Sequence, residues 1–340
     1  MSDGVMPPAV AELYYRVSGA ASGLFPGHHR SRSGDAGFEF RGHAALHDAP
    51  DVRRLDLHAS LRDPFGAWQV RLHSQRKAIP VVLVADLSAS MGFGCPQADD
   101  IRRPPPEGVK ETWGGPAFPW EGAQCKLDVL ADLVHSLAWS AWRTGDSFGF
   151  VGCDERVRAD LTIAQTRRRG AGLALARTLR GLQPTGRSAR ALGEAHRHLP
   201  SRRALVFLVS DFHLPLEQID TVLKSLALHE VVPVVLWQPV EFALGAVRGL
   251  AQVQEPEGGT RQWLWWRPAL RERWREALQH RRDALQLCFR RHRLKPLFIE
   301  GPFEADAVTR HFLSGRSPAA ADSALRSGGS GARDGGLVNP

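Results

Sequence analysis

The sequence predicts an α/β fold, in which a doubly wound, mostly parallel sheet carries helices on both faces and follows a β-rich N-terminal extension. Two short apolar runs, at 79–85 and 203–209, are rich in branched aliphatic residues and stop at polar residues. Runs of this length are typical of strands that are buried on both faces. Such runs alternate with amphipathic helical patterns, which is the order of βαβ units.

The predicted elements alternate along the whole central part of the chain, and we expect about six strands in the sheet. They are a strand at 79–85, a helix at 125–143, strands at 147–153 and 156–161, helices at 170–182 and 189–199, a strand at 203–209, a helix at 216–228, a strand at 230–237 and a long amphipathic helix at 268–293.

We expect four parts along the chain, the second of which carries an insertion. They are an N-terminal extension at 1–76, β-rich from about residue 35; an α/β domain at 77–255; a C-terminal helical segment at 256–314; and a disordered tail at 315–340, which is low in apolar residues. The insertion, at 92–124, directly follows the first strand. Its length and its richness in Pro, Gly and Trp favour a lid or a partner-binding element.

The composition restricts the class of protein. The net charge is +8, but the basic residues are scattered and accompany no helix-turn-helix or RNA-binding signature. Four cysteines without C-x-x-C spacing argue against a zinc site or a disulfide scaffold and favour free thiols, with pairing of Cys95 and Cys125 across the insertion as the alternative. No apolar run approaches the ~20 residues of a membrane helix, and no signal peptide is evident. We therefore expect a cytoplasmic protein with no membrane insertion.

Polar side chains follow both apolar runs at the same position. Asp86, Ser88 and Ser90 come after the first run, and Asp211 comes after the second. Ligand sites of open α/β sheets lie outside the carboxyl ends of the strands, so these side chains should meet. Carboxylate and hydroxyl oxygens with little total charge are ligands that suit Mg²⁺. The residues therefore predict a metal site at this edge of the sheet.

The D-x-S-x-S spacing resembles the metal-ion-dependent adhesion site of von Willebrand factor A-type domains. The resemblance implies a further ligand between the two strands, usually Thr. Here Ser188 takes that place, because the turn at 183–188 puts it at the N-cap or first turn of the following helix; Thr185, which precedes the turn at Gly186, is the alternative. The implied ligand set is Asp86, Ser88, Ser90, Ser188 and Asp211, and the implied cofactor is Mg²⁺, with Mn²⁺ or Ca²⁺ as alternatives.

Three segments upstream of the first strand resemble a narrower family, domain of unknown function 58, whose members carry a von Willebrand A-type domain. They are GFEFR at 37–41, DVRRLD at 51–56 and ASLRD at 59–63. The family pattern here is G-x-G-x-E-F, G-D-x-x-R-x-I-D-W and S-A-R-T, from which this chain departs at Leu57, where Trp is usual, and at Leu61 and Asp63. The resemblance covers about residues 34–255. It implies a companion of a MoxR-type AAA+ ATPase, including accessory factors for cofactor insertion into a client enzyme.

The expected function is therefore a metal-dependent protein-interaction module, not an enzyme, that binds an acidic residue of a MoxR-type ATPase or of its client. The first alternative is a metal-dependent hydrolase or phosphotransferase that uses Asp86 and Asp211. Ser88 stands where haloacid-dehalogenase phosphotransferases need a second Asp, and the chain has no phosphate-binding loop or nucleophile elbow. The second alternative is nucleic-acid binding through the Arg-rich surface.

Overall fold

The structure is a computed structural model, and it describes residues 11–17, 26–30, 39–74, 76–93, 124–238, 241, 249–254, 257–258 and 261–314. The tail at 315–340 and nearly all of the predicted insertion lie outside these residues. Within the described part, no helix is long and apolar enough to cross a membrane.

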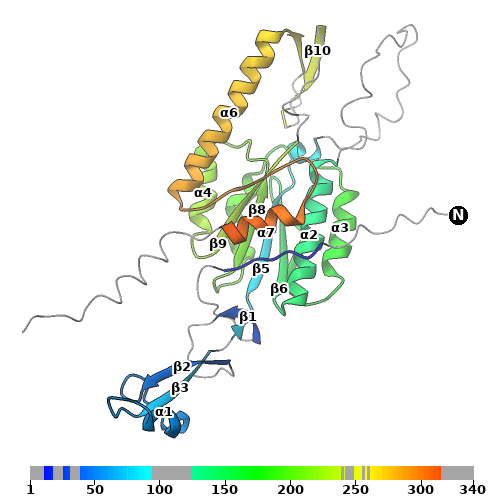
Figure 1. The fold of residues 1–340 in the computed structure, drawn as a ribbon. Helices are drawn as coiled ribbons and strands as arrows, with labels where there is room; N and C mark the ends of the chain where they lie inside the picture. The colour runs from blue at the N-terminus through cyan, green and yellow to red at the C-terminus, as the bar shows by residue number, and fades with distance from the viewer. Residues whose placement is uncertain are drawn as a thin grey trace, which may run out of the picture.

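A six-stranded sheet forms the centre of the molecule (Figure 1). Its order is β12-β9-β8-β5-β6-β7; neighbouring strands are parallel, except that β7 runs antiparallel to β6. This confirms the predicted mostly parallel sheet, with the first apolar run as a central strand. The strands are β5 (Pro80–Asp86), β6 (Ser147–Cys153), β7 (Val157–Thr166), β8 (Leu205–Ser210), β9 (Glu230–Trp237) and β12 (Leu297–Glu300).

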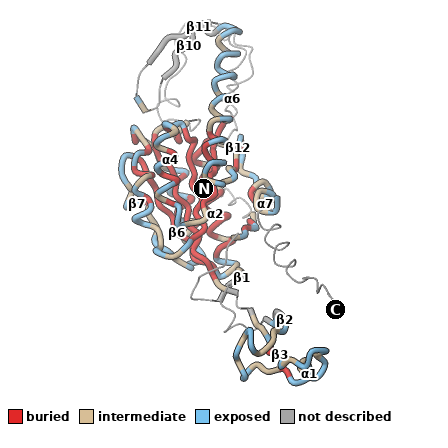
Figure 2. The backbone as a smooth tube through the Cα atoms, turned by 90° about the vertical axis from the view of Figure 1, so that its left-hand side faces the viewer, coloured by how far each residue is buried: buried red, intermediate tan, exposed pale blue. Residues whose placement is uncertain are grey.

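Helices cover both faces of this sheet. The alternation of β5 separates the two cores: Leu83 packs with α2, α3 and α7, whereas Val84 packs with η3, α4 and α6. Figure 2 shows the buried residues concentrated in and around the central sheet. The bounds are α2 (Lys126–Arg143), α3 (Ala171–Arg180), η3 (Arg190–His198), α4 (Leu216–Ser225), α6 (Pro268–Arg291) and α7 (Ala305–Ser314).

The N-terminal extension is built from two small antiparallel pairs, as its β-rich sequence predicts. They contain β1 (Pro26–Arg30) with β4 (Arg76–Lys77), and β2 (Glu39–Ala45) with β3 (Gln69–Ser74), joined by η1 (Val52–Arg54) and α1 (Leu57–Leu61). Asp56 stabilises the second pair, because its carboxylate accepts a hydrogen bond from Arg71 Nε at 2.7 Å and caps α1 at Ala59 N. Figure 1 shows this pair beyond one edge of the central sheet.

The C-terminal segment contains strands as well as the expected helices. The hairpin of β10 (Gly249–Gln254) and β11 (Arg261–Trp266) crosses the predicted boundary at residue 255 and lies with the start of α6 beyond the opposite edge of the sheet (Figure 1). β12 pairs with β9 and so supplies the sixth strand of the main sheet from within 256–314.

The cysteines depart from the expectation of free thiols at one position. Cys125 is disulfide-bonded, whereas Cys153 and Cys288 are free and buried. Cys95 lies outside the described residues. The prediction used sequence spacing, but cysteines pair according to their separation in the folded chain.

Candidate metal centre at the carboxyl edge of the sheet

The first strand end forms a compact loop around the carboxylate of Asp86. β5 ends at Asp86, which is 1% exposed. Asp86 Oδ1 accepts hydrogen bonds from Ser88 N at 2.9 Å and Ser88 Oγ at 2.7 Å, and Oδ2 accepts one from Ser210 Oγ at 2.7 Å. The following short helix η2 (Ala89–Gly92) then places Ser90 Oγ 3.1 Å from Ser88 Oγ. The loop therefore gathers one carboxylate and two hydroxyls in a buried position.

The second strand end brings Asp211 to the same place. β8 ends at Ser210, and Asp211 follows at 1% exposure. The side chain of Ser90 is hydrogen-bonded to the Asp211 carboxylate, and the charges of Asp86 and Asp211 interact. Phe212, the next residue, has φ of +53°, a left-handed conformation that is rare for an aromatic residue. The structure thus brings together four of the five predicted ligands, and strained backbone lies directly beside them.

The third predicted segment lies against the first loop through its backbone. Ser88 and Gly186 form a parallel bridge, and Ala89 N donates to Gly186 O at 2.7 Å. A Cβ atom at Gly186 would lie 2.6 Å from Asp154 Cβ, so only glycine fits this approach. Among the described residues, no hydrogen bond joins the hydroxyl of Ser188 or of Thr185 to the Asp86 cluster, and Thr185 is exposed.

The predicted capping role of Ser188 is wrong. The following helix, η3, is a 3₁₀ helix that begins at Arg190, and its N-cap is Ala189 with no side-chain hydrogen bond. The helix begins one residue later than the pattern at 189–199 predicts, because apolar periodicity fixes the position of a helix but not its terminal residue. Ser188 precedes the cap by one residue and is half-buried, and its predicted role as a ligand stays a prediction.

The two carboxylates have opposite electrostatic environments. Burial, together with the neighbouring charge of Asp211, raises the pKa of Asp86 to about 7 despite its hydrogen bonds from Ser88 and Ser210. Burial also opposes ionisation of Asp211, but the ammonium of Lys126, with a smaller contribution from His213, outweighs it and lowers the pKa of Asp211 to about 2. The cluster therefore holds Asp211 as a carboxylate, while Asp86 has no cation of its own.

Two residues that the sequence pattern did not predict, Lys126 and Glu241, complete the polar cluster. Lys126 Nζ lies 2.9 Å from Asp211 Oδ2 and 2.7 Å from Glu241 Oε1. Glu241 Oε2 lies 3.5 Å from His213 Nε2. One signal was available in the sequence: a lysine at the first position of a helix, where the helix dipole disfavours a cation.

The donor chemistry on the Asp86 side fits a small divalent cation. Because the hydroxyl of Ser88 donates its proton to Asp86, its lone pairs remain for a cation. The separation of 3.1 Å between Ser88 Oγ and Ser90 Oγ is close to the roughly 2.9 Å between adjacent ligands of an octahedral Mg²⁺. Within the described residues there is no group of three His, Cys, Asp or Glu that could hold a metal ion, so any such site relies on the serines.

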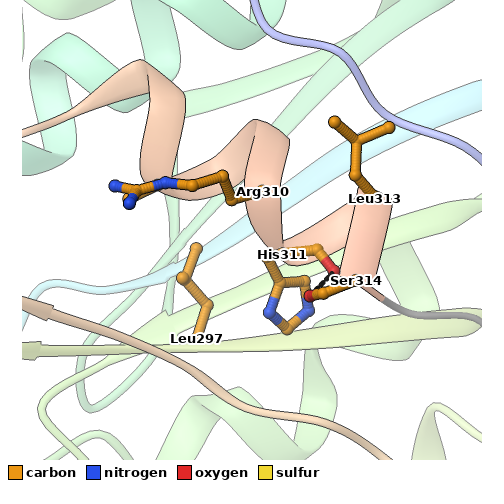
Figure 3. Close-up of a pocket in the computed structure, with 6 residues that line it drawn as sticks. Leu297, Arg310, His311, Leu313 and Ser314 are labelled. Carbon is orange, nitrogen blue, oxygen red and sulfur yellow. Dashed lines mark hydrogen bonds between the residues drawn. The ribbon is translucent and has the colours of Figure 1, made fainter.

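A surface pocket lies apart from this cluster. It has a volume of about 630 Å³ and lies between β12 and α7 (Figure 3). Its lining contains none of the predicted ligands and consists of Leu297, Ala307, Arg310, His311, Leu313 and Ser314. The candidate centre is therefore a buried cluster at the strand ends rather than a large cavity.

The sheet order, with an antiparallel strand at one edge, and the D-x-S-x-S loop at the end of a central strand define a protein of the von Willebrand A type. The family described as "Protein of unknown function DUF58" matches residues 120–284, which include Lys126 and Asp211 but begin after Asp86. A relative, "Uncharacterized protein in moxR 3'region" of Paracoccus denitrificans, is 33% identical over 101 residues, which are 30% of this chain and 96% of the relative. The chain belongs to the DUF58 family.

Solved structures show more distant likenesses. One is a conserved hypothetical protein BatB from Bacteroides thetaiotaomicron, with a TM-score of 0.36 and 11% identity, covering 69% of this chain and 96% of that one. Another is proximal thread matrix protein 1 from the mussel byssus, whose title describes a zinc-occupied MIDAS motif; its TM-score is 0.29 at 13% identity, and the match covers 47% of this chain and 38% of that one. Neither likeness adds to what the topology shows.

Proposed function

We propose that this chain is a metal-dependent protein-interaction module whose ligands are Asp86, Ser88, Ser90, Ser188 and Asp211. The observation that carries the proposal is the pair of buried aspartates, each hydrogen-bonded by a serine hydroxyl whose lone pairs remain for a cation. Asp86 lacks a positive partner in the described structure, and its raised pKa expresses this electrostatic deficit. A divalent cation would supply the missing charge.

The cation would provide one coordination position for an oxygen from outside the chain. Hydroxyls and few carboxylates leave such an ion with much of its positive charge, so that it attracts a further carboxylate. An acidic side chain of another protein is therefore the ligand class that we propose. Its contact would be charge-assisted and would concentrate much of the binding energy in one residue.

We infer that the partner is a MoxR-type AAA+ ATPase or its client protein. The supporting observation is the relative in Paracoccus denitrificans, which is described as a protein of the moxR 3' region. A role in the assembly of a client enzyme, or in the insertion of its cofactor, follows from the family resemblance. We propose no catalytic step for this module: the hydroxyl of Ser88 donates to a carboxylate and lies 3.1 Å from that of Ser90, and within the described residues no hydrogen bond joins either hydroxyl to an imidazole.

The test combines metal binding with partner recovery. Asp86→Asn preserves the shape of the loop, because the Ser210 hydroxyl can turn to accept a hydrogen bond from the new amide. We expect Mn²⁺ to bind this variant about 10–100-fold more weakly than wild type, as followed by electron paramagnetic resonance. Pull-down of a purified MoxR-type ATPase should fall to the level obtained with EDTA.

Asp160→Asn is the matched control, because Asp160 is exposed on β7 and the substitution removes the same charge. It should bind Mn²⁺ and the ATPase as wild type does. Equal recovery from wild type, Asp86→Asn and EDTA-treated protein would show that the contact with the ATPase lies elsewhere on the molecule.

A further inference from the structure

Lys126 occupies a position that two physical effects disfavour. It is the first residue of α2, where the helix dipole repels a positive charge, and its side chain is only 2% exposed. Burial of an ammonium is costly unless opposite charges and hydrogen bonds compensate it. The charged state of a lysine in such a position is stabilised only by its acidic partners, so those partners indicate its role.

Two carboxylates share this one ammonium. Lys126 Nζ lies 2.9 Å from Asp211 Oδ2 and 2.7 Å from Glu241 Oε1, and it donates more weakly to Ser90 O at 3.4 Å. Despite its burial, the pKa of Lys126 is raised by these two carboxylates. No ion pair joins Lys126 to Asp86 among the described contacts. The built-in cation therefore neutralises the Asp211 side of the centre and leaves the Asp86 side to another ion.

Glu241 is attached both to the centre and to the C-terminal part of the molecule. Its side chain is 11% exposed and also lies beside His213, while its backbone carbonyl accepts a hydrogen bond from Trp274 Nε1 of α6 at 3.0 Å. The same helix binds the Asp211 loop, because Arg281 donates to Phe212 O and Leu214 O. α6 thus holds both carboxylate-bearing segments that contact Lys126.

We propose that Lys126 is a built-in counter-ion that competes with the divalent cation for Asp211, and that Glu241 retains the ammonium when the cation binds. This inference rests on the proposed function, since it concerns the same metal centre. Asp211 is paired with the ammonium of Lys126 in this structure, and the metal would take the place of that ammonium when it binds. The affinity of the centre for metal then depends on how strongly the ammonium of Lys126 is bound by Asp211, which the metal needs, relative to Glu241, which the metal does not need.

The proposal predicts metal affinities that change in opposite directions. Lys126→Met removes the competitor and leaves two carboxylates without a cation, so Mn²⁺ should bind at least about tenfold more tightly than to wild type. Glu241→Gln removes the alternative partner of the ammonium, so Mn²⁺ should bind about 3–10-fold more weakly. Lys126→Met leaves buried carboxylates unpaired and can therefore destabilise the fold. Glu241→Gln keeps the Lys126–Asp211 pair and supplies the second measurement. Electron paramagnetic resonance of free Mn²⁺ gives both affinities.

Two exposed residues provide matched controls. Lys224→Met and Glu304→Gln make the same charge changes at side chains that are 70% and 65% exposed, and neither should alter Mn²⁺ affinity. Unchanged or weaker binding by a folded Lys126→Met variant would overturn the inference, as would unchanged binding by Glu241→Gln. If wild type binds Mn²⁺ through Asp86 in that experiment, the proposed function survives. If neither wild type nor Lys126→Met binds Mn²⁺, both proposals fail.

Discussion

Two buried aspartates lie at opposite edges of the same sheet and differ in how their charge is compensated. Asp86 ends β5 at the carboxyl edge, and Asp146 directly precedes β6 at the amino edge. Asp146 accepts hydrogen bonds from Tyr15 Oη at 2.6 Å, Thr144 Oγ1 at 2.7 Å and Ile79 N at 2.8 Å. His29 Nε2 lies 3.0 Å from it as well. Asp86 instead faces a second carboxylate.

The difference separates a structural carboxylate from the one that we propose as a metal ligand. Burial opposes ionisation of Asp146, but hydrogen bonds from His29 and Tyr15 outweigh it and lower its pKa, whereas the pKa of Asp86 is raised. Asp146 links four parts of the chain at the amino edge of the sheet, through Tyr15, His29 of β1, Ile79 and Thr144, so its charge stabilises the fold. The charge of Asp86 is compensated only incompletely within the described structure, which is what a site for a cation requires.

The largest expected effect tests Asp146 as the structural member of this pair. Asp146→Ala leaves several buried donors unpaired, and we expect the free energy of unfolding to fall by about 3–5 kcal/mol. Urea denaturation followed by circular dichroism measures this loss. Asp160→Ala removes only an exposed ion pair with Arg158 and should change the free energy by less than about 1 kcal/mol. A loss below about 1 kcal/mol for Asp146→Ala would mean that the cluster does not hold the segments together.

The pH dependence of stability should have opposite signs at the two edges. The pKa of Asp86 is about 7 in the folded protein and near its ordinary 3.8 in the unfolded chain, so between these values the folded state retains a proton that the unfolded state releases. Its contribution to stability is therefore greatest below about pH 4 and declines by a few kcal/mol as pH rises towards 7. Asp146, with its lowered pKa, contributes above its ordinary value and loses that contribution as pH falls.

Urea titrations in EDTA between pH 4.5 and 7.5 test this contrast. The difference in unfolding free energy between wild type and Asp86→Asn should shift against wild type as pH rises, because the amide carries no titratable proton. Parallel curves for the two proteins over this range would contradict the assignment of the raised pKa to Asp86.

The smallest effect concerns one donor of the Asp146 cluster. Tyr15→Phe removes the hydrogen bond to Asp146 and the 2.9 Å contact with Thr144 Oγ1 but leaves the other donors to Asp146, so we expect a loss of about 1 kcal/mol in the free energy of unfolding. Tyr14→Phe is the matched control, because Tyr14 is 50% exposed and only its backbone N–H takes part in the hydrogen bond to Thr309. An equal effect of the two substitutions would show that the Tyr15 hydroxyl contributes nothing specific.

The sequence by itself determined the sheet and the position of four predicted ligands. Apolar runs such as 79–85 are a local property of the chain, and burial on both faces follows from their length and composition. Because parallel strands end at a common edge, Asp86 and Asp211 were predicted to meet. Ser210, which precedes Asp211 and donates a hydrogen bond to Asp86, lies 124 positions away from Asp86 in the chain. These conclusions need only the strand pattern and the parallel arrangement that it predicts.

Only the tertiary structure decided how the charges of this centre are balanced. Lys126 and Glu241 approach Asp211 from a helix and from a segment far away in the chain, and no periodic pattern encodes which side chains will share a buried position. The same holds for Ser188, which lies one residue before the N-cap of a 3₁₀ helix, and for β12, which joins the sheet from beyond a long helix. Local patterns determine elements, whereas the ionisation of a buried group depends on every charge around it, and those charges converge only in the folded chain.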